Sequence, residues 1–267
     1  MDRYVIRGGA AGADRLQVLA RSWAATTGDL LDLAGVASGQ TCLDVGCGAG
    51  DVTLELARRV GPTGRVTGVD MDAVTLDVVR ERAADEGLTW VDLVELDVHD
   101  LAEPSTYDLA YCRNLLQHLT RPVSVVRSMW EAVRPGGVLV LEDADFEGSF
   151  CYPPHAGFDF WVDRYQRVLR SYGGDPQSGR KVAAHLLAVG APSPQTRVVQ
   201  RADLVGEPKS MPLLTVQATA DAMLDAGIAT EAEIAWACEA LAALADDDST
   251  LVGSPRIVQA WARRPAT

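Results

Sequence analysis

The stretch Cys42-Leu43-Asp44-Val45-Gly46-Cys47-Gly48-Ala49-Gly50-Asp51 decides the fold of this chain. An apolar run ends in an acid, glycines follow at alternate positions, and a helical pattern of apolar residues opens at Val52. A strand that turns tightly into a helix has this pattern, because glycine tolerates positive φ and has no Cβ to keep a ligand away from the backbone. Free N–H groups at the helix start favour an anionic group such as a carboxylate or phosphate. The stretch therefore predicts a ligand site where a strand meets a helix.

Strands and helices alternate at short spacing through residues 41–142, beginning with this stretch. The expected strands are 41–46, 65–70, 91–96, 107–112 and 138–142, and the expected helices are 51–60, 72–86 and 120–133. Such alternation is typical of right-handed βαβ crossovers, which build a doubly wound α/β fold with helices on both faces of a parallel sheet. Ligands then bind beyond the carboxyl ends of the strands, where the strand order reverses.

The flanking segments are predicted to extend the same single domain. Residues 1–35 form an arm and two helices, the first capped by Asp14 and the second around residues 30–33. Residues 36–146 form the ligand-binding core, and 147–190 form an inserted lid of aromatic helices, although an ordinary surface helix explains 147–178 equally well. In 191–267, strands 196–204 and 255–263 and the helices between them complete a sheet of about seven strands with an antiparallel edge strand.

Composition narrows the function classes. The 267 residues carry a net charge of −13, which argues against a nucleic-acid partner. No apolar run reaches the length of a membrane span or a signal peptide, so a cytoplasmic protein without a membrane partner is expected. The five cysteines are scattered, which is typical of reduced thiols, and no Cys/His cluster has zinc spacing.

The glycine spacing and the acids that follow outline one ligand. No GK[ST] follows the glycines, which excludes a P-loop, and the spacing is GxGxG rather than the GxGxxG of dinucleotide sites. Asp70 ends the second strand, where a carboxylate can accept from both hydroxyls of a ribose. Asp97 ends the third strand, where it can accept from an exocyclic amine such as that of adenine. These positions together suggest an adenosine with an amino-acid tail and no pyrophosphate.

These residues resemble a known family. Residues 43–50 resemble motif I of the class I S-adenosylmethionine-dependent methyltransferases, and Val69-Asp70 and Leu96-Asp97-Val98 resemble its ribose-binding and adenine-binding acids. Leu116-Gln117-His118-Leu119 and Arg134-Pro135-Gly136-Gly137 match the segments that follow strand 4 and precede strand 5. The resemblance covers residues 36–146, is strongest to the small-molecule group related to quinone-biosynthesis methyltransferases, and implies a Rossmann-like fold.

The resemblance also implies a cofactor, S-adenosylmethionine, and its product, S-adenosylhomocysteine. The residues expected to bind this cofactor are Tyr4, Asp44, Gly46, Gly48, Gly50, Asp70, Met71, Asp97, Val98 and Arg113. Some of them have a simpler explanation: the acids as helix or turn caps, Arg113 as a surface ion-pair residue, and Met71 as a filler of the core. Three acids at successive strand ends beside a glycine loop favour the cofactor site.

The sequence says less about catalysis. Methyl transfer from a sulfonium needs mainly positioning in a dry pocket, and a base only where the acceptor arrives protonated. His118, at a helix start on the ligand side, is the first candidate, and a structural hydrogen bond explains it at least as well. Asp143 and Asp145 beyond strand 5 are the next, and the simpler explanation for both is that they cap a loop. A metal at Asp143 and Asp145 is a minor option, and none is predicted. The residues expected to line an acceptor pocket, unless they belong to the core, are His155, Phe158, Trp161 and Tyr165.

The leading hypothesis is therefore a methyltransferase of secondary metabolism that acts on O, N, C or S of a small-molecule acceptor. The alternatives are a protein that binds the cofactor without methylating, such as a pericyclic or rearrangement enzyme or a binding module, and a nicotinamide-dependent oxidoreductase. The sequence is compatible with a homodimer but does not fix the oligomeric state.

Overall fold

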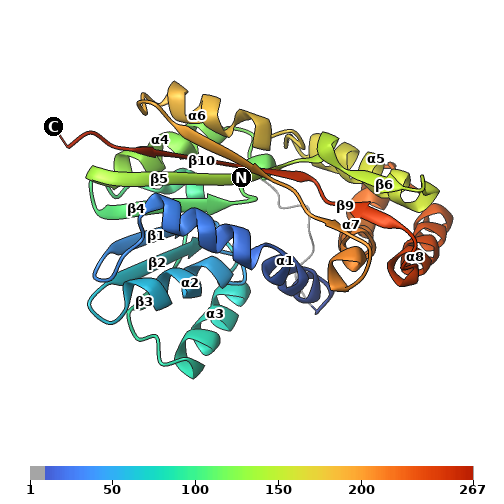
Figure 1. The fold of residues 1–267 in the computed structure, drawn as a ribbon, viewed down its shortest axis with the longest axis horizontal. Helices are drawn as coiled ribbons and strands as arrows, with labels where there is room; N and C mark the ends of the chain where they lie inside the picture. The colour runs from blue at the N-terminus through green and yellow to red at the C-terminus, as the bar shows by residue number, and fades with distance from the viewer. Residues whose placement is uncertain (1–9, 267) are drawn as a thin grey trace.

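A seven-stranded sheet forms the centre of the computed structural model, which describes residues 10–266 (Figure 1). Its strand order is β3-β2-β1-β4-β5-β10-β7. The strands are β1 (Thr41–Val45), β2 (Arg65–Asp70), β3 (Val91–Glu95), β4 (Tyr107–Arg113), β5 (Val133–Asp145), β7 (Gln195–Val199) and β10 (Arg256–Arg263). Strands β1 to β5 pair in parallel, whereas β10 is antiparallel to both β5 and the edge strand β7. The predicted Rossmann-like α/β fold is confirmed.

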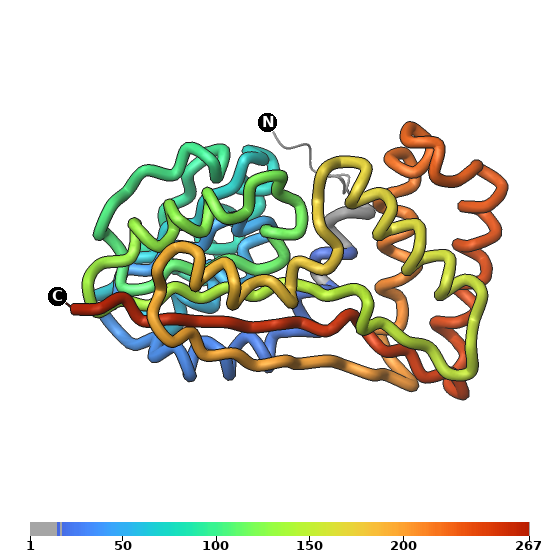
Figure 2. Tube along the Cα trace, turned by 90° about the horizontal axis from the view of Figure 1, so that it is seen from above, coloured from blue at the N-terminus to red at the C-terminus, as the bar shows by residue number. Residues whose placement is uncertain are grey.

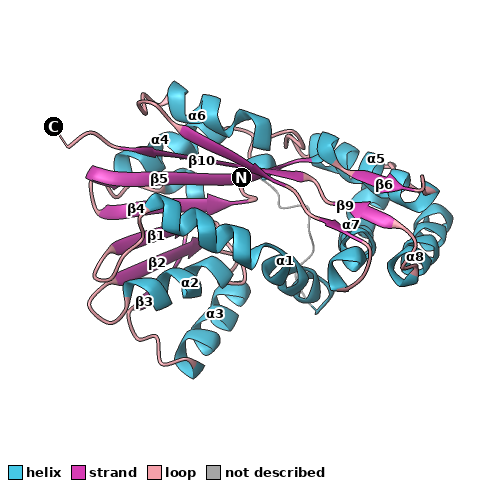
Figure 3. Cartoon of the chain, in the orientation of Figure 1, coloured by secondary structure: helices cyan, strands magenta, loops and turns pink. Residues whose placement is uncertain are grey.

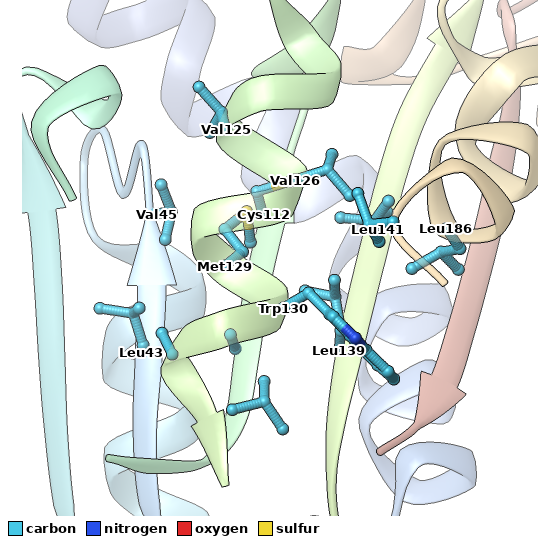
Figure 4. Close-up of a cluster of buried hydrophobic side chains, with 14 of the residues drawn as sticks. Leu43, Val45, Cys112, Val125, Val126, Met129, Trp130, Leu139, Leu141 and Leu186 are labelled. Atoms are coloured by element: carbon cyan, nitrogen blue, oxygen red, sulfur yellow. The ribbon is translucent and has the colours of Figure 1, made fainter. Parts of the chain in front are cut away.

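Helices cover both faces of this sheet (Figure 3). The helices on one face are α1 (Ala10–Ala34), through its C-terminal half, α2 (Asp51–Val60) and α3 (Ala73–Asp85). The helices on the other face are α4 (Pro122–Ala132) and α6 (Val182–Ala188). In Figure 4, Val125, Val126 and Met129 of α4 pack over Val45 of β1 and Leu141 of β5. Each such side chain stabilises the fold by about 1.5–3 kcal/mol through its removal from water.

The strand order reverses between β1 and β4, because the chain builds β2 and β3 on one side of β1 and β4 and β5 on the other. The glycine loop leaves β1 at this point and enters α2 through Gly50, which has φ 79°. Asp72 caps α3 by accepting from the amides of Val74 and Thr75. These turns place the carboxyl ends of β1, β2 and β4 around one crevice, as doubly wound folds require.

A second group of elements forms what we call the cap, at the right of Figure 1. The elements of the cap are α5 (Ala156–Ser171), α7 (Met211–Asp225), α8 (Glu231–Asp246) and a three-stranded sheet of β6 (Phe150–Tyr152), β9 (Leu251–Gly253) and β8 (Ala202–Asp203). The three helices pack on one another around an apolar cluster that includes Phe158, Trp161 and Tyr165. Figure 2 shows how segments far apart in the sequence meet in the cap.

The cap differs from the predicted lid in its membership. Residues 182–188 were expected in the lid, but α6 packs against β10 and α4 and covers the sheet. Helices α7 and α8 were expected to complete the sheet, but they pack with α5 in the cap. The expected strand 196–204 divides into β7 of the large sheet and β8 of the small one. Amphipathic periodicity shows that a helix has an apolar face but not which surface that face covers.

The N-terminal region also differs, because one continuous helix, α1, replaces the two expected helices. Asp14 lies inside this helix and is therefore not its cap. Gly28 costs a helix interior about 1 kcal/mol relative to Ala, but here its carbonyl accepts from Arg59 Nη2 of α2 at 3.2 Å. Tertiary contacts of this kind hold the helix through a residue that favours a break. None of the helices in residues 10–266 has the length and apolar character to cross a membrane.

Candidate functional site

A cavity of about 760 Å³ lies where the carboxyl ends of the strands face the cap. Two sets of residues line it, which we call the strand end and the cap end. The strand end includes Asp44, Gly46, Gly48, Asp70, Met71, Asp97, Val98 and Arg113. The cap end includes Arg15, Leu16, Leu19, Phe146, Trp161, Tyr165, Thr215, Val252 and Ile257. One cavity thus joins most of the predicted cofactor residues to an apolar chamber under the cap.

The glycine loop needs glycine at each of its three positions, for different reasons. Gly46, Gly48 and Gly50 have φ values of 69°, 50° and 79°, which L-residues with a Cβ rarely adopt. A Cβ on Gly46 would lie 2.9 Å from Leu115 Cδ1, and one on Gly50 would lie 2.4 Å from Val79 Cγ1. A Cβ on Gly48 would have no atom within 4 Å. Gly48 therefore keeps backbone open to the cavity, whereas the other two allow close packing.

Asp70 lies at the end of β2 and holds the loop. Its Oδ2 accepts from the Gly48 amide at 2.9 Å, and its Oδ1 accepts from the Asp72 amide at 3.1 Å. Each carboxylate oxygen has a second lone pair, so the side chain can still accept from a ligand. Asp70 thus links the glycine loop to the start of α3 while its side chain lines the cavity.

Asp97 and Met71 line the same end of the cavity. Asp97 Oδ1 accepts from the His99 amide at 3.0 Å and caps the 3₁₀ helix η1 (Val98–Asp100), so this acid is a cap as well as a cavity residue. Met71 is 43% exposed, which contradicts its simpler explanation as a filler of the core. Both residues lie where the sequence placed them, and their contact with adenine stays a prediction.

Asp44 and Arg113 lie deeper. Asp44 Oδ2 accepts from Thr53 Oγ1 at 2.7 Å, and burial raises the pKa of Asp44 to about 6. Arg113 Nη1 donates to Thr27 Oγ1 at 3.3 Å, and no ion pair of Arg113 is found within residues 10–266. The surface ion pair considered for Arg113 is therefore not what the described residues show.

A buried carboxylate, Glu142 of β5, lies opposite Arg113 of β4 in the sheet. Glu142 is 1% exposed and accepts from the Tyr111 hydroxyl, from Thr27 Oγ1 at 3.1 Å and from Gln259 Nε2 at 2.8 Å. These donors come from α1, β4 and β10, so one side chain connects three elements. A charged acceptor with several donors is among the stronger hydrogen-bonded groups in a protein interior. Sequence reasoning did not single out this network.

His118, the first catalytic candidate, lines the cavity from η2 (Leu116–His118). Burial, and next the nearby charge of Arg15, lower the pKa of His118 to about 3. The imidazole is therefore neutral at physiological pH, which a base requires, but its affinity for a proton is low. The geometry favours His118 as a hydrogen-bonding residue of the cavity more than as a proton acceptor.

The other two catalytic candidates, Asp143 and Asp145, do not line the cavity. Asp143 Oδ2 accepts from the Gln117 amide at 2.9 Å and from Ser178 Oγ at 3.1 Å, and burial raises the pKa of Asp143 to about 7. Asp145 accepts from Arg180 Nε and from Arg256 Nη2, both at 3.0 Å. Asp145 also caps a 3₁₀ turn by accepting from the Glu147 amide, as its simpler explanation held, whereas Asp143 connects segments of the fold.

The predicted acceptor pocket is brought together only in part. Trp161 and Tyr165 line the cavity, whereas His155 and Phe158 do not. His155 occupies the N-cap position of α5, and the Phe158 ring packs edge-on against Trp161 with 5.2 Å between centroids. Phe158, Trp161 and Tyr165 are spaced i, i+3 and i+7 and share one face of α5, so Phe158 differs from the other two in its place along the helix and not in its face. Tyr4 lies outside the described residues.

Several polar residues of the cavity were not predicted as site residues. They are Arg15, Asn114, Gln117, Arg201, Asp203 and Thr215. Asn114 has φ 52° and follows β4, and a non-glycine residue with this backbone beside a ligand loop often marks a functional position. The positions of Arg15, Arg201 and Thr215 depend on how the cap packs on α1, which local patterns do not encode.

Comparison with known proteins gives the family. A model of the methyltransferase domain matches residues 37–169, about half of the chain. The ubiquinone biosynthesis O-methyltransferase of Serratia proteamaculans is 38% identical over 109 residues, which is 40% of this chain and 44% of that protein. The C-methyltransferase UbiE of ubiquinone/menaquinone biosynthesis from Pseudomonas aeruginosa is 37% identical over 115 residues, 42% of this chain and 45% of that protein. The chain belongs to the class I S-adenosylmethionine-dependent methyltransferases.

This family assignment confirms the resemblance and disagrees with the nicotinamide-dependent alternative. The matches span less than half the length of these curated relatives. The family model covers the core and ends within α5, so α7, α8, β8 and β9 of the cap lie outside it. A phosphoethanolamine N-methyltransferase of Haemonchus contortus, solved with S-adenosylhomocysteine and phosphomonomethylethanolamine, shares the fold with a TM-score of 0.57 at 16% identity. The alignment covers 94% of this methyltransferase and 57% of the Haemonchus chain.

Proposed function

We propose that this methyltransferase binds S-adenosylmethionine at the strand end of the cavity and transfers its methyl group to a small-molecule acceptor at the cap end. The observation that carries the proposal is Gly48. Its amide is held by Asp70, and the space beside its Cα is open to a cavity at the point where the strand order reverses. A Cβ at this position would project into that space.

The residues present fit this cofactor. The glycine loop offers backbone to the methionyl part, Asp70 offers lone pairs to the ribose hydroxyls, and Asp97 and Val98 border the place for the adenine. Arg113 lines the cavity, its charge acts on Asp44 at the end of β1, and a guanidinium suits the cofactor carboxylate. The cofactor supplies a methyl group on a sulfonium, whose leaving group departs without protonation.

The chain's own residues then have to position the acceptor and exclude water. Leu19, Phe146, Trp161 and Ile257 form apolar walls next to the strand end, which suits an in-line displacement in a dry pocket. A neutral His118 can orient an acceptor by a hydrogen bond. We place the reaction in the cytoplasm, supported by the scattered cysteines, and we expect neither a nucleic acid nor a membrane as partner.

The test is binding of S-adenosylhomocysteine by calorimetry, followed by a search for acceptors that convert S-adenosylmethionine to S-adenosylhomocysteine. Asp70→Asn should weaken S-adenosylhomocysteine binding about tenfold or more, because the charged acceptor is lost while an oxygen remains for the Gly48 amide. Asp77→Asn, which changes an exposed carboxylate of α3, is the matched control and should leave the affinity unchanged.

Unchanged affinity in a folded Asp70→Asn protein would mean that Asp70 only holds the loop. Absence of S-adenosylhomocysteine binding to the unmodified protein would overturn the proposal. Binding without turnover across acceptor classes would indicate a protein that keeps the cofactor site but does not methylate.

A further inference from the structure

The cap end of the cavity is mostly apolar, which makes its few polar side chains informative. The apolar residues there are Leu16, Leu19, Trp23, Phe146, Val252 and Ile257. Ligand sites of this kind bind mainly through apolar contact and are given orientation by a small number of polar groups. The polar groups at the cap end should therefore report which chemical group of the acceptor they bind.

Arg15 is a buried cation at this end. It is 7% exposed, and its Nε donates to Thr215 Oγ1 of α7 at 3.1 Å. Among the carboxylates whose side chains the structure describes, none forms an ion pair with Arg15. A buried charge without a counter-charge is costly, and its cost falls when an anion binds beside it.

Arg201 also lines this cavity, but unlike Arg15 it pairs with a carboxylate that the structure describes. Arg201 Nη2 is 2.7 Å from Asp203 Oδ1, and Arg201 Nη1 donates to the Ser22 carbonyl at 3.2 Å. Its charge is compensated within the protein. Among the described side chains, the partner of Arg15 is the Thr215 hydroxyl, so Arg15 is the cation of the cap end whose charge an anionic ligand can compensate.

Two further side chains of the cavity, Trp161 and His118, are also consistent with an anionic ligand beside Arg15. Trp161 Nε1 is buried, lines the same cavity and has no hydrogen-bond partner within the described residues. An indole N–H can only donate. The charge of Arg15 reaches His118, whose pKa it helps to lower, so the guanidinium lies near an imidazole that is neutral and cannot replace it as a cation. Arg15 and Trp161 thus both offer N–H donors to a ligand, and one of these donors carries a positive charge.

We propose that the acceptor is a largely apolar molecule with an anionic oxygen group, such as a carboxylate or a phosphate monoester, and that Arg15 binds this group at the cap end. The inference rests on the proposed function, since it identifies the substrate class of the same cavity. Trp161 supplies a second donor, and the apolar walls hold the rest of the molecule. Amines and neutral polyols fit this arrangement poorly, because they bring no counter-charge to Arg15.

The test compares matched probes on the complex of the protein with S-adenosylhomocysteine. The probe pairs are decanoate with decanamide, 4-hydroxycinnamate with its amide, and 2-naphthyl phosphate with 2-naphthol, each titrated by calorimetry. We expect the anion of at least one pair to bind about tenfold tighter than its neutral partner. A preference confined to the naphthyl pair would assign a phosphate, and one confined to the other pairs a carboxylate.

Variants of the two arginines on α1 test whether Arg15 causes the preference for anionic probes. Arg15→Gln should abolish it, and Arg15→Lys should keep part of it, because lysine retains the charge without the planar fork. Arg21→Gln is the matched control, since Arg21 lies on the same helix but is exposed and pairs with Glu207. It should leave the preference unchanged.

Two results would overturn the inference while the proposed function stands. One is S-adenosylhomocysteine binding with no anion preference in any pair for the unmodified protein, a result that does not depend on how the variants fold. The other is an anion preference that survives Arg15→Gln or is lost equally in Arg21→Gln. Failure of S-adenosylhomocysteine itself to bind would instead overturn the proposed function and this inference with it.

Discussion

Asp143 shows how a single buried residue sets a dependence of stability on pH. Burial raises the pKa of Asp143 to about 7, although it accepts from the Gln117 amide and from Ser178 Oγ. In the unfolded chain the pKa of this carboxyl is near its ordinary value of about 3.9. Between these values the folded state holds more protons than the unfolded state. The contribution of Asp143 to stability is therefore complete below about pH 4 and is lost as the pH rises towards 7.

Asp143→Asn removes this titration. The free energy of unfolding of the unmodified protein minus that of the variant should be smaller at pH 8 than at pH 5, as measured by urea denaturation at both values. Asp77→Asn, at an exposed site, is the control and should show no such change. A difference that is constant or grows with pH would contradict the raised pKa.

Residues of the candidate site were predictable where the chain itself sets their position. Asp44, Asp70 and Asp97 each end or follow a strand, so parallel pairing brings them to one edge of the sheet. Their surroundings were not predictable. Asp143 was expected beyond its strand but lies within β5, and its side chain accepts from Ser178 and does not line the cavity.

Individual elements depend on contacts that no local pattern encodes. Helices α5 and α6 follow each other in the chain, but α5 packs in the cap and α6 on the sheet. Their apolar periodicity predicted two helices correctly and could not assign either to a layer. The alternating region 41–142 was predictable because short βαβ connections allow few topologies. The cap was not, because its helices and strands come from two separate segments, 150–171 and 202–253.

Asp145 connects three elements of the fold through its side chain. It ends β5, is 3% exposed, and accepts from Arg180 of η4 (Gly179–Lys181) and Arg256 of β10. The two arginine side chains are 41% and 40% exposed, and Arg180 also pairs with Glu147, so water and Glu147 compensate part of the charge that Asp145 would no longer balance. Asp145→Asn should lower the free energy of unfolding by roughly 1–2 kcal/mol, since two charged hydrogen bonds are weakened.

Urea denaturation measures this loss, and calorimetry with S-adenosylhomocysteine tests whether the folded protein keeps its affinity. Asp77→Asn again serves as the control, because its pair with Arg80 is exposed and worth about 1 kcal/mol or less. A stable Asp145→Asn protein without turnover would return Asp145 to a catalytic role.

At the scale of the whole molecule, one cavity connects the part of the chain that the methyltransferase family model matches to a part that lies mostly outside the match. The strand end belongs to the matched methyltransferase core, and most of the cap end comes from α1, α7 and β9, outside residues 37–169. Helix α1 joins the two parts, since its C-terminal half packs on the sheet and Arg15 and Ser22 bond to the cap side. Cofactor and acceptor binding should therefore respond to different substitutions.

Tyr165 tests this division. It is fully buried, lines the cap end, and its ring lies 4.9 Å from that of Phe146 between centroids. Tyr165→Leu should raise the KM of the acceptor about tenfold through lost aromatic contact and leave the Kd of S-adenosylhomocysteine within about twofold. Phe160→Leu is the matched control, because this ring of the same helix packs on Trp236 and does not line the cavity. Combined with Asp70→Asn, the effects of Tyr165→Leu on the two constants should add, since the residues share no contact. A loss of cofactor affinity in Tyr165→Leu alone would show that the cap orders the strand end, and the cavity would then have to be treated as one coupled site.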